Sequence, residues 1–386
     1  MKVLHVIPSL SSLRGGPTFV LRTLASHLAS AGVQVHVATT DDDGRRRQDV
    51  PLGTPVSADG ATYWYFGRTT RTYSSSIGLT SWLLRHTAEF DLVHIHSLFS
   101  FPATAAAAIA HRRAIPYVVR PLGVLNRWGL GSGRAWVKRL SIRLIESAVV
   151  RCAAAIQFSS ETERRETEEV CPLGRAVVIP NPVDLDPPAG RGLFRARYPS
   201  FGDRPVVLFL ARLSPVKGVE LLLEAFRIVR RANPQAVLVV AGSGDESYVR
   251  DLRTRADRIG ISNDVVWTGF LDRSAKAAAL ADADVFVVPS RSESFGLAAV
   301  EALSAGVPTV ITEGVGIADE VAASGAGVVV PPTASAIADA IGRILSSAEL
   351  AAGLSSRGAL LVRSCYRPDA VAAQVMKLYA EIGCRS

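Results

Sequence analysis

Two cations lie close together in the segment ARLSPVKG, which joins a predicted strand to a predicted helix. Arg212 and Lys217 come just before this helix, which we expect to begin at Val219. The free backbone N–H groups at a helix N-terminus also attract anions. A guanidinium can bind two phosphate oxygens at once, whereas an ammonium acts as a point charge. The spacing favours a diphosphate site, although a solvated loop would have the same composition.

Two glutamates lie in the segment SESFGLAAVEAL, which follows another predicted strand. Glu293 and Glu301 are eight residues apart, and we expect a helix to begin between them, near Gly296. Because ionised carboxylates only accept hydrogen bonds, one of them suits a sugar hydroxyl and the other a ribose diol. The backbone N–H groups of Phe295, Gly296 and Leu297 are predicted to face the same ligand. A capped surface helix is the simpler alternative.

Short glycine segments follow two further predicted strands. Gly242 and Gly244 belong to AGSG, and Gly15 and Gly16 lie between the first strand and the first helix. Glycine allows a ligand to approach the backbone closely, so we assign Gly16, Gly242 and Gly244 to the donor side and Gly15 to the acceptor side. A simple turn explains each pair equally well, because G-x-G alone is a weak signal.

Four further residues resemble metal ligands, but a structural role is the better interpretation for each. Asp282 and Asp284 form a D-x-D pattern at a predicted helix end that runs into a buried strand. His94 and His96 alternate on one strand and share one face, without an accompanying carboxylate or cysteine cluster. We predict that His96 lines the cleft or the core, and that the protein needs no metal or other cofactor.

The elements that carry these residues alternate between strands and helices along the whole chain. The 386 residues suffice for two or three ordinary domains, and a hydrophobic fraction of 48% argues against disorder. This rhythm predicts an α/β fold of two doubly wound, Rossmann-like domains that face each other across a cleft. The Pro- and Gly-rich segment VIPNPVDLDPPAGRG marks the boundary. We expect domains over residues 1–185 and 186–365, with a C-terminal helix over 366–386 that packs back onto the first domain.

Positive charge is concentrated in the first half of the chain. Of the net charge of +8, residues 1–185 contribute +7. Such an imbalance points to a polyanionic neighbour, and we find no nucleic-acid-binding motif, so nucleic acid is not expected. Residues 134–151 contain one acid and form a basic amphipathic pattern that could rest on an anionic membrane, or simply face solvent. The charged loop DDDGRRRQDV over residues 41–50 is expected to be solvated.

The sequence indicates a cytoplasmic protein, with a possible position at the inner face of the cell membrane. The apolar run Val3 to Ile7 is too short for a signal peptide core. No stretch approaches the roughly 18 apolar residues that span a bilayer.

These motifs, taken in order, resemble the retaining glycosyltransferases of family 4, which have the GT-B fold. The resemblance covers about residues 15–330, and its most specific segment is DVFVVPSRSESFGLAAVEALSAGVPTVIT. The resemblance implies that Arg212 and Lys217 hold the donor diphosphate. It also implies that Glu293 and the backbone of residues 295–297 hold the transferred sugar, and that Glu301 holds the ribose.

The chain departs from the family pattern in one loop. Many members have a histidine before a glycine in the loop after the strand PYVV, and this chain has Leu122 at that position. The form P-x-G-x-L, followed here by Trp128, resembles a subset of the family. Arg120 is our candidate for contacting the sugar or acceptor from the N-terminal side.

The resulting hypothesis is a retaining transfer of a hexose from a UDP- or GDP-sugar to a hydroxyl of a glycan or lipid-linked acceptor, in surface polysaccharide synthesis. Two alternatives stay open: a nucleotide-sugar epimerase or hydrolase on the same scaffold, and a non-catalytic nucleotide-sugar-binding subunit. An NAD-dependent oxidoreductase is disfavoured, because no complete G-x-G-x-x-G follows a strand with an acidic residue about 20 positions later.

Overall fold

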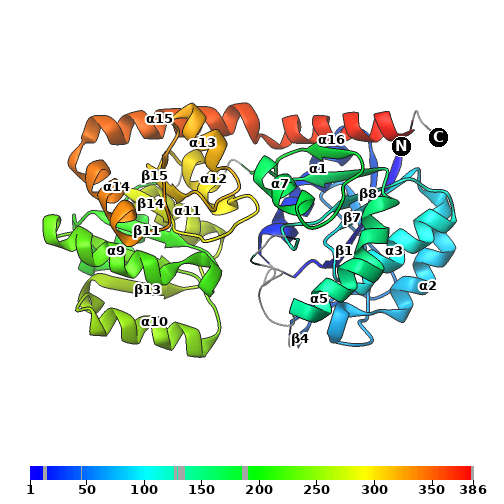
Figure 1. Ribbon diagram of the computed structural model, residues 1–386, viewed down its shortest axis with the longest axis horizontal. Helices are drawn as coiled ribbons and strands as arrows, with labels where there is room; N and C mark the ends of the chain where they lie inside the picture. The colour runs from blue at the N-terminus through cyan, green and yellow to red at the C-terminus, as the bar shows by residue number, and fades with distance from the viewer. Residues whose placement is uncertain (12–14, 45, 126–127, 129–134, 185–189, 384–386) are drawn as a thin grey trace. The chain divides into compact units, whose positions relative to one another are not determined.

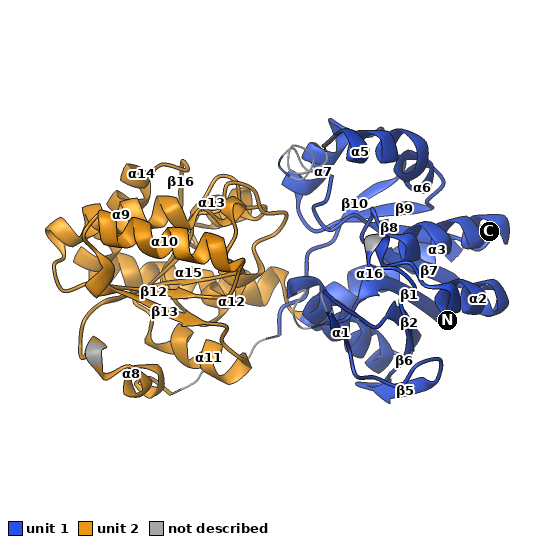
Figure 2. Cartoon of the chain, turned by 90° about the horizontal axis from the view of Figure 1, so that it is seen from below, with its two compact units in different colours: residues 1–184, 368–386 blue, residues 185–367 orange. Residues whose placement is uncertain are grey.

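The computed structural model describes residues 1–11, 15–44, 46–125, 128, 135–184 and 190–383, and it divides into two units (Figure 2). Unit 1 comprises Met1–Asp184 together with Pro368–Ser386, and unit 2 comprises Leu185–Arg367. These limits lie within two residues of the expected boundaries, and the C-terminal helix belongs to unit 1. No helix in the described ranges is both long and apolar enough to cross a membrane.

Unit 1 is built on an eight-stranded sheet in the order β10-β9-β8-β7-β1-β2-β6-β5. All neighbouring strands are parallel except β5 and β6, which form an antiparallel pair. The strands are β1 (Lys2–Ser9), β2 (Gln34–Thr40), β5 (Pro55–Ala58), β6 (Ala61–Phe66), β7 (Leu92–His96), β8 (Tyr117–Arg120), β9 (Ala155–Phe158) and β10 (Ala176–Val178). The helices include α1 (Gly16–Ser30), α2 (Ile77–His86), α3 (Phe101–Arg112), α5 (Ala135–Ser141), α6 (Ser147–Arg151), α7 (Glu161–Glu168) and α16 (Pro368–Gly383).

Helices cover both faces of this sheet, which explains the almost continuous apolar runs in its central strands. On one face, Val3 and Leu92 pack with Leu24 of α1 and Val375 of α16. On the other face, β1 and β7 pack against α2 and α3. Helix α16 comes from the far end of the chain and lies beside α1 (Figure 1). The last helix is therefore part of the first hydrophobic core.

Unit 2 is built on six parallel strands in the order β13-β12-β11-β14-β15-β16. The strands are β11 (Val206–Leu210), β12 (Val237–Ala241), β13 (Val265–Gly269), β14 (Val285–Val288), β15 (Thr309–Thr312) and β16 (Val328–Val330). The helices are α8 (Leu193–Arg197), α9 (Val219–Ala232), α10 (Glu246–Arg258), α11 (Arg273–Asp282), α12 (Leu297–Ser304), α13 (Ala318–Ser324), α14 (Ala334–Ser346) and α15 (Ala348–Cys365).

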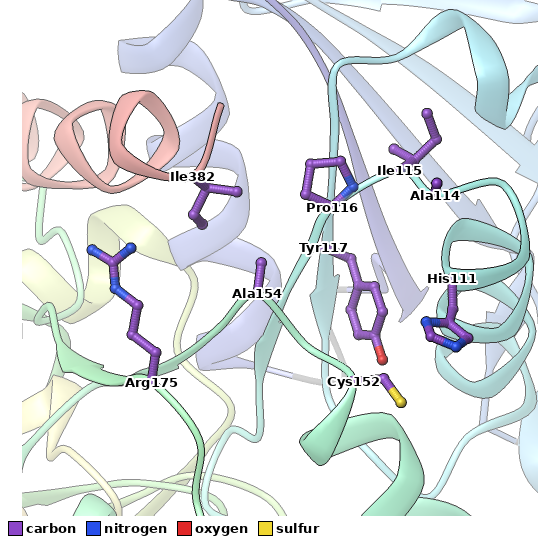
Figure 3. A pocket seen from close by; sticks show the side chains of 9 residues that line it. All are labelled: His111, Ala114, Ile115, Pro116, Tyr117, Cys152, Ala154, Arg175 and Ile382. Atoms are coloured by element: carbon purple, nitrogen blue, oxygen red, sulfur yellow. The ribbon is translucent and has the colours of Figure 1, made fainter. Parts of the chain in front are cut away.

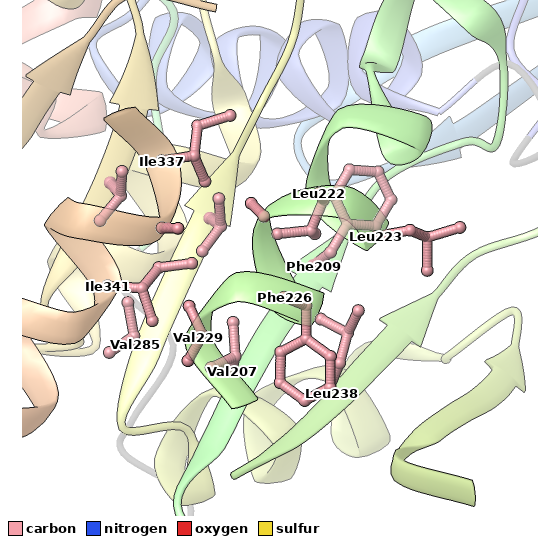
Figure 4. Packing of buried hydrophobic residues seen from close by; sticks show 14 of the residues in the cluster. Val207, Phe209, Leu222, Leu223, Phe226, Val229, Leu238, Val285, Ile337 and Ile341 are labelled. Atoms are coloured by element: carbon pink, nitrogen blue, oxygen red, sulfur yellow. The ribbon is translucent and has the colours of Figure 1, made fainter. Parts of the chain in front are cut away.

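The core of unit 2 shows why α9 is a helix at this place. Leu222, Phe226 and Val229 recur at helical spacing, so one side of α9 is apolar and buries against the sheet. Ile337 and Ile341 of α14 pack beside them (Figure 4). The two helices thus cover one face of the sheet, and the loop before α9 is fixed at its edge.

Each sheet has one point at which the order of its strands reverses. In unit 2 the chain runs from β11 to β12 and β13 on one side, and from β14 to β15 and β16 on the other. In unit 1 the reversal lies between β1 and β7. Open parallel sheets bind ligands outside the carboxyl ends of their strands at such points. The loops after β11, β14, β1 and β7 are the places where function is expected.

The acidic segment at residues 41–43 is not solvated, contrary to the sequence-based expectation. Asp41 and Asp42 are buried. Asp42 forms an ion pair with the buried Arg68, whose backbone N–H donates to Asp41 at 2.8 Å. The carboxylate of Asp42, which we expected in a solvated loop, instead neutralises a buried arginine that follows β6, the strand next to β2.

The D-x-D segment has the structural role that the sequence favoured. Asp282 caps α8 by accepting hydrogen bonds from the backbone N–H groups of Gly192, Phe194 and Arg195, at 2.6–3.0 Å. Asp284 accepts from the N–H of Val206 at 2.7 Å and so fixes the start of β11. Both carboxylates therefore stabilise the backbone before and at the start of β11.

Candidate active site

An ion pair joins the two loops at the reversal point of unit 2. Lys217 lies in the loop after β11, and Glu293 lies in the loop after β14. The Lys217 Nζ is 2.7 Å from Glu293 Oε1, and both side chains are about four-fifths buried. Ser290 Oγ donates to the other carboxylate oxygen at 3.1 Å. The two residues that the sequence placed in separate loops are therefore direct neighbours.

The backbone around Glu293 is held by its neighbours on both sides. The N–H of Glu293 donates to Gly314 O at 2.8 Å, and its carbonyl accepts from the N–H of Gly316 at 2.7 Å. The N–H of Arg291 donates to Val216 O at 2.8 Å, which ties this loop to the loop that carries Lys217. The carboxylate is consequently fixed by a framework that does not depend on a ligand.

Helix α12 begins directly after this loop and presents unused donors. Gly296 is the N-cap, with φ of 105°, a value that disfavours other residues. The side chain of Phe295 is turned into the interior and packs edge-on against Tyr366. Among the described residues, no acceptor is found for the backbone N–H groups of Phe295, Gly296 and Leu297. This N-terminus can therefore bind an electronegative group.

Glu301 has a partner that the sequence analysis missed. Lys276, in the first turn of α11, places its Nζ 2.6 Å from Glu301 Oε1. Both side chains remain about one-fifth exposed. The second carboxylate oxygen of Glu301 has no hydrogen-bond partner among the described residues and can still accept a hydrogen bond. Only the contact across two helices could have identified Lys276, because 25 residues separate it from Glu301.

Arg212 differs from Lys217 in having no anionic partner. Its side chain is exposed, and no ion pair or hydrogen bond of its guanidinium is found within the described ranges. Arg212 follows β11, the strand next to the reversal point. The sheet thus presents one cation that is already neutralised by a glutamate and one that is not.

Gly242 and Gly244 are explained by contact with the segment that carries Arg212. A Cβ at Gly242 would overlap the carbonyl oxygen of Ala211, and one at Gly244 would overlap that of Leu213. The N–H of Leu213 donates to Ser243 O at 2.8 Å. These glycines let two backbones approach each other, and their predicted contact with the donor stays a prediction.

In unit 1, the loop after β1 leads to the N-terminus of α1. Gly15 is the N-cap, with φ of 70°, and Gly16 is the first helical residue. Neither has a side chain that could cap the helix, and Thr18 binds back to Ser11 O at 2.9 Å. Both glycines lie at the reversal point of this sheet, as a role at the acceptor or donor would require.

Three buried histidines form a cluster beneath α1 and α16. His5 Nδ1 and His96 Nε2 share a hydrogen bond of 2.9 Å, and His94 Nδ1 shares one of 2.7 Å with the hydroxyl of Tyr379. Burial lowers the pKa of His5 to about 3 and holds the pKa values of His94 and His96 well below 6.5. The positive charge of Arg120 acts in the same direction. The rings are therefore neutral at physiological pH.

This cluster is close enough to hold a metal ion, because the candidate ligand atoms of the three histidines lie within 4.8 Å of one another. The nearby guanidinium of Arg120 disfavours a further cation, and three ring nitrogens, His5 Nδ1, His96 Nε2 and His94 Nδ1, already take part in hydrogen bonds. His96 itself is buried, so a role in lining a ligand site stays a prediction.

Arg120 is also buried, and its partner is a side chain of the segment that leads out of unit 1. Its Nη2 donates to Asn181 Oδ1. Burial lowers the pKa of Arg120 to about 10, which leaves it charged at neutral pH. Its Nε has no partner among the described residues. This position favours holding the Asn181 segment over direct contact with a sugar.

The loop after β8, which departs from the family pattern, is held by a hydrogen bond to Glu163. Leu122 has φ of 59°, which is unusual for a residue with a side chain, and Gly123 follows it. The N–H of Gly123 donates to the buried Glu163 at 2.6 Å. Glu163 also accepts from Ser159, while Ser160 caps α7. Strained backbone held by surrounding bonds is typical of functional loops.

A surface pocket of about 350 Å³ lies at the amino-terminal edge of the unit 1 sheet, opposite to the carboxyl ends of its parallel strands (Figure 3). Its lining includes Pro116, Ala154 and Arg175, each of which precedes a strand. It therefore opens at the amino ends of β8, β9 and β10. Because parallel sheets bind ligands at their carboxyl ends, we do not assign the reaction to this pocket.

Two family models match the chain and together cover most of it. The model described as "Glycosyltransferase Family 4" matches residues 14–187, and the model described as "Glycosyl transferases group 1" matches residues 191–360.

Characterised relatives and solved structures agree with these matches. A GDP-mannose-dependent alpha-(1-6)-phosphatidylinositol monomannoside mannosyltransferase of Mycobacterium tuberculosis is 32% identical over 56% of this chain and 59% of that protein, so the match spans little more than half of the relative. A phosphatidyl-myo-inositol mannosyltransferase of Mycobacterium leprae is 28% identical over 91% of this chain and 93% of that protein. The structure of Anabaena Alr3699/HepE in complex with UDP-glucose superposes with a TM-score of 0.80 at 19% identity, over 99% of this chain and 100% of that one.

The two parallel sheets and their matches define a glycosyltransferase of the GT-B fold. Its first half matches the family 4 model and its second half the group 1 model, so the chain is family 4-like.

Proposed function

We propose that this enzyme transfers a hexose from a UDP- or GDP-sugar to a hydroxyl group, with retention of the anomeric configuration and without a metal ion. One observation carries the proposal: the Lys217–Glu293 pair and the exposed Arg212 come from the loops after β11 and β14, which flank the reversal point of unit 2. Two cations and a fixed carboxylate at this place suit a sugar diphosphate.

The proposed roles follow from the charge that the reaction creates. When the bond between the anomeric carbon and the diphosphate breaks, negative charge develops on the departing phosphate oxygen. Arg212 and Lys217 neutralise it, and the free N–H groups at the start of α12 add to the positive potential. Because these groups are held before the donor binds, they need little reorganisation during the reaction.

The carboxylates orient the donor. Glu293 accepts a hydrogen bond from a sugar hydroxyl, and its pairing with Lys217 keeps both residues beside the reacting carbon. Glu301, oriented by Lys276, accepts from the ribose diol. The acceptor hydroxyl attacks from the face that the phosphate leaves, its oxygen forms the new bond, and its proton passes to the departing diphosphate.

The relatives support a nucleotide-sugar donor and a lipid-linked acceptor. The M. tuberculosis enzyme is named for GDP-mannose and a phosphatidylinositol mannoside, and the Anabaena protein was solved with UDP-glucose. We therefore propose a UDP- or GDP-hexose as donor, and as acceptor a glycan or glycolipid of the cell surface. Gly15 and the loops after β7 and β8 of unit 1 are the proposed acceptor side, and Gly16 keeps its proposed place on the donor side.

The test is a product analysis with a panel of UDP- and GDP-hexoses and lipid-linked acceptors. We expect a free nucleoside diphosphate and a glycoside whose anomeric configuration, read by NMR at early times, equals that of the donor. An inverted product would refute retention. An epimerase would leave the nucleotide attached to the sugar, a hydrolase would release free sugar in the presence of acceptor, and a non-catalytic subunit would bind the donor without turnover.

A further inference from the structure

A continuous helical segment in unit 1 carries apolar side chains that face solvent. It consists of α5, a π-helical turn (Ile142–Glu146) and α6. Ile142, Val149 and Val150 anchor it in the hydrophobic core. On its outer side, the exposed fractions are 72% for Trp136, 49% for Leu140 and 66% for Leu144.

The spacing of these three residues shows that they form one stripe. Trp136, Leu140 and Leu144 are four residues apart, so they lie above one another on the same side of a helix. Ile145, next to them, is 39% exposed. Single exposed apolar residues are common on proteins, but a tryptophan and three aliphatic side chains on adjoining turns make a continuous apolar surface.

Basic side chains border this stripe. Arg139 and Arg143 are exposed and lie one helical turn apart beside it. Neither has an ion-pair partner in the described part of the chain. Arg151 is exposed at the end of α6. Arg134, which belongs to the same basic sequence pattern, lies outside the described residues.

The one acidic residue of this segment is withdrawn from its surface. Glu146 is buried, and its Oε1 accepts a hydrogen bond from Ser141 Oγ at 3.2 Å and lies 3.5 Å from the hydroxyl of Tyr73. Burial raises the pKa of this carboxyl. The outer side of the segment is therefore apolar in its middle and positively charged at its rim, with no negative charge.

We propose that α5 and the π-helical turn dock this enzyme onto an anionic lipid bilayer, with Trp136, Leu140, Leu144 and Ile145 inserted at the level of the lipid headgroups and Arg139 and Arg143 bound to lipid phosphates. An amphipathic helix with a bulky apolar face and a cationic rim is the form that lies in a membrane interface. The segment, which we call the docking helix, is visible at the periphery of unit 1 in Figure 2 as α5 and α6.

Charge decides between a bilayer and a second copy of the chain. In a symmetric dimer through this surface, the same patch would face itself, and Arg139 and Arg143 would meet their own counterparts without an intervening acid. An anionic bilayer presents the opposite charge to every one of these arginines. The inference extends the proposed function to a partner surface, and it does not depend on the identity of the donor.

The test is flotation of the full-length protein with vesicles of phosphatidylcholine containing phosphatidylglycerol, and with vesicles of pure phosphatidylcholine. We expect binding to the anionic vesicles, weaker binding to the neutral ones, and loss of binding at high salt. Trp136→Ser with Leu144→Ser should reduce the vesicle partition coefficient at least tenfold. Arg139→Gln with Arg143→Gln should reduce it by about fivefold for each arginine.

Matched variants in unit 2 serve as controls. Leu360→Ser removes an aliphatic side chain that is 58% exposed on α15, and Arg231→Gln with Arg258→Gln removes two exposed charges. These variants should float like the unmodified protein. Brominated acyl chains should quench the fluorescence of the unmodified protein more than that of Trp136→Phe.

Three results would overturn the inference: no flotation of the unmodified protein, equal flotation of the docking-helix variants, or a dimer in sedimentation that Trp136→Ser dissolves. Donor binding is measured on the same variants by calorimetry. It should be unchanged, which shows that the variants are folded. A failure of vesicle binding is thereby distinguished from a failure of the proposed transferase function.

Discussion

The polar clusters of the two sheets differ in charge and in exposure. In unit 1, His5, His94 and His96 are fully buried and neutral, and they bond to one another and to Tyr379. In unit 2, Lys217 and Glu293 are charged, partly exposed and paired. A buried neutral network fixes a core, whereas a partly exposed ion pair can still form hydrogen bonds with a ligand. The comparison supports the proposal that unit 2 carries the donor chemistry.

The largest expected effect concerns the buried histidines and pH. The folded pKa of His5 is about 3, below its ordinary value of 6.5, so only the unfolded chain binds protons between these values. Stability is therefore full above pH 6.5 and falls as the pH is lowered through this window. At about 1.4 kcal/mol per pH unit below 6.5, His5 alone destabilises unit 1 by roughly 1.4 kcal/mol near pH 5.5, and the lowered pKa values of His94 and His96 act in the same direction.

Hydrogen exchange of the β1 and β7 amides, corrected for intrinsic rates, reports this effect in unit 1 alone. His5→Gln should weaken the pH dependence, and His111→Gln, which alters an exposed histidine, is the matched control. Equal protection of these amides above pH 6.5 and near pH 5.5 would contradict the proposed neutral network.

The second effect concerns the paired cation of unit 2. Lys217→Ala should fold normally and lower kcat by about a hundred- to a thousandfold, because one preorganised group that stabilises the leaving diphosphate is lost. Lys377→Ala, which removes an exposed ammonium from α16, is the control and should keep full activity. Normal turnover of Lys217→Ala would remove this residue from the mechanism.

A somewhat smaller effect is expected at the unpaired cation. Arg212→Ala should lower kcat/KM by about ten- to a hundredfold, since the guanidinium is more exposed to water than Lys217 and its charge is better screened. Arg212→Lys should recover part of this loss, because charge is kept while bidentate binding is not. Steady-state kinetics of the unmodified enzyme, Arg212→Ala and Arg212→Lys measure this effect. Identical kcat/KM values for the three proteins would show that Arg212 contacts no phosphate.

The smallest effect is expected for the second carboxylate. Glu301→Ala should weaken the binding of free nucleoside diphosphate by about tenfold and change kcat little, because a hydrogen bond to a charged group is lost equally in the ground state and the transition state. Lys276→Ala should act in the same direction, and the double variant should show less than the sum of both effects. Calorimetry measures these affinities, and an unchanged affinity for Glu301→Ala would exclude the ribose role.

The sequence predicted the elements well where their signals are local. The helix expected from Val219 begins there, and the helix expected near Gly296 begins at Leu297. In each place a glycine precedes a run with helical periodicity, so a few neighbouring residues suffice for the prediction.

The sequence could not predict the partners of the site residues. His94 and Tyr379 are separated by 285 positions, Arg120 and Asn181 by 61, and Lys276 and Glu301 by 25. Such pairs form only when strands and helices pack, and no periodic pattern in the sequence predicts them. The same reason explains why Asp41 and Asp42 looked like part of a solvated loop, although Arg68 neutralises Asp42 in the interior.

The central claim is that fixed side-chain cations, and no divalent ion, neutralise the departing diphosphate. It is tested most directly by the transfer rate of the unmodified enzyme in excess EDTA and in excess Mg²⁺, with Arg212→Ala and Lys217→Ala measured beside it. The account predicts equal rates for the unmodified enzyme in both conditions, and losses in the two variants that Mg²⁺ does not restore. Loss of transfer in EDTA, with recovery on addition of Mg²⁺, would contradict it.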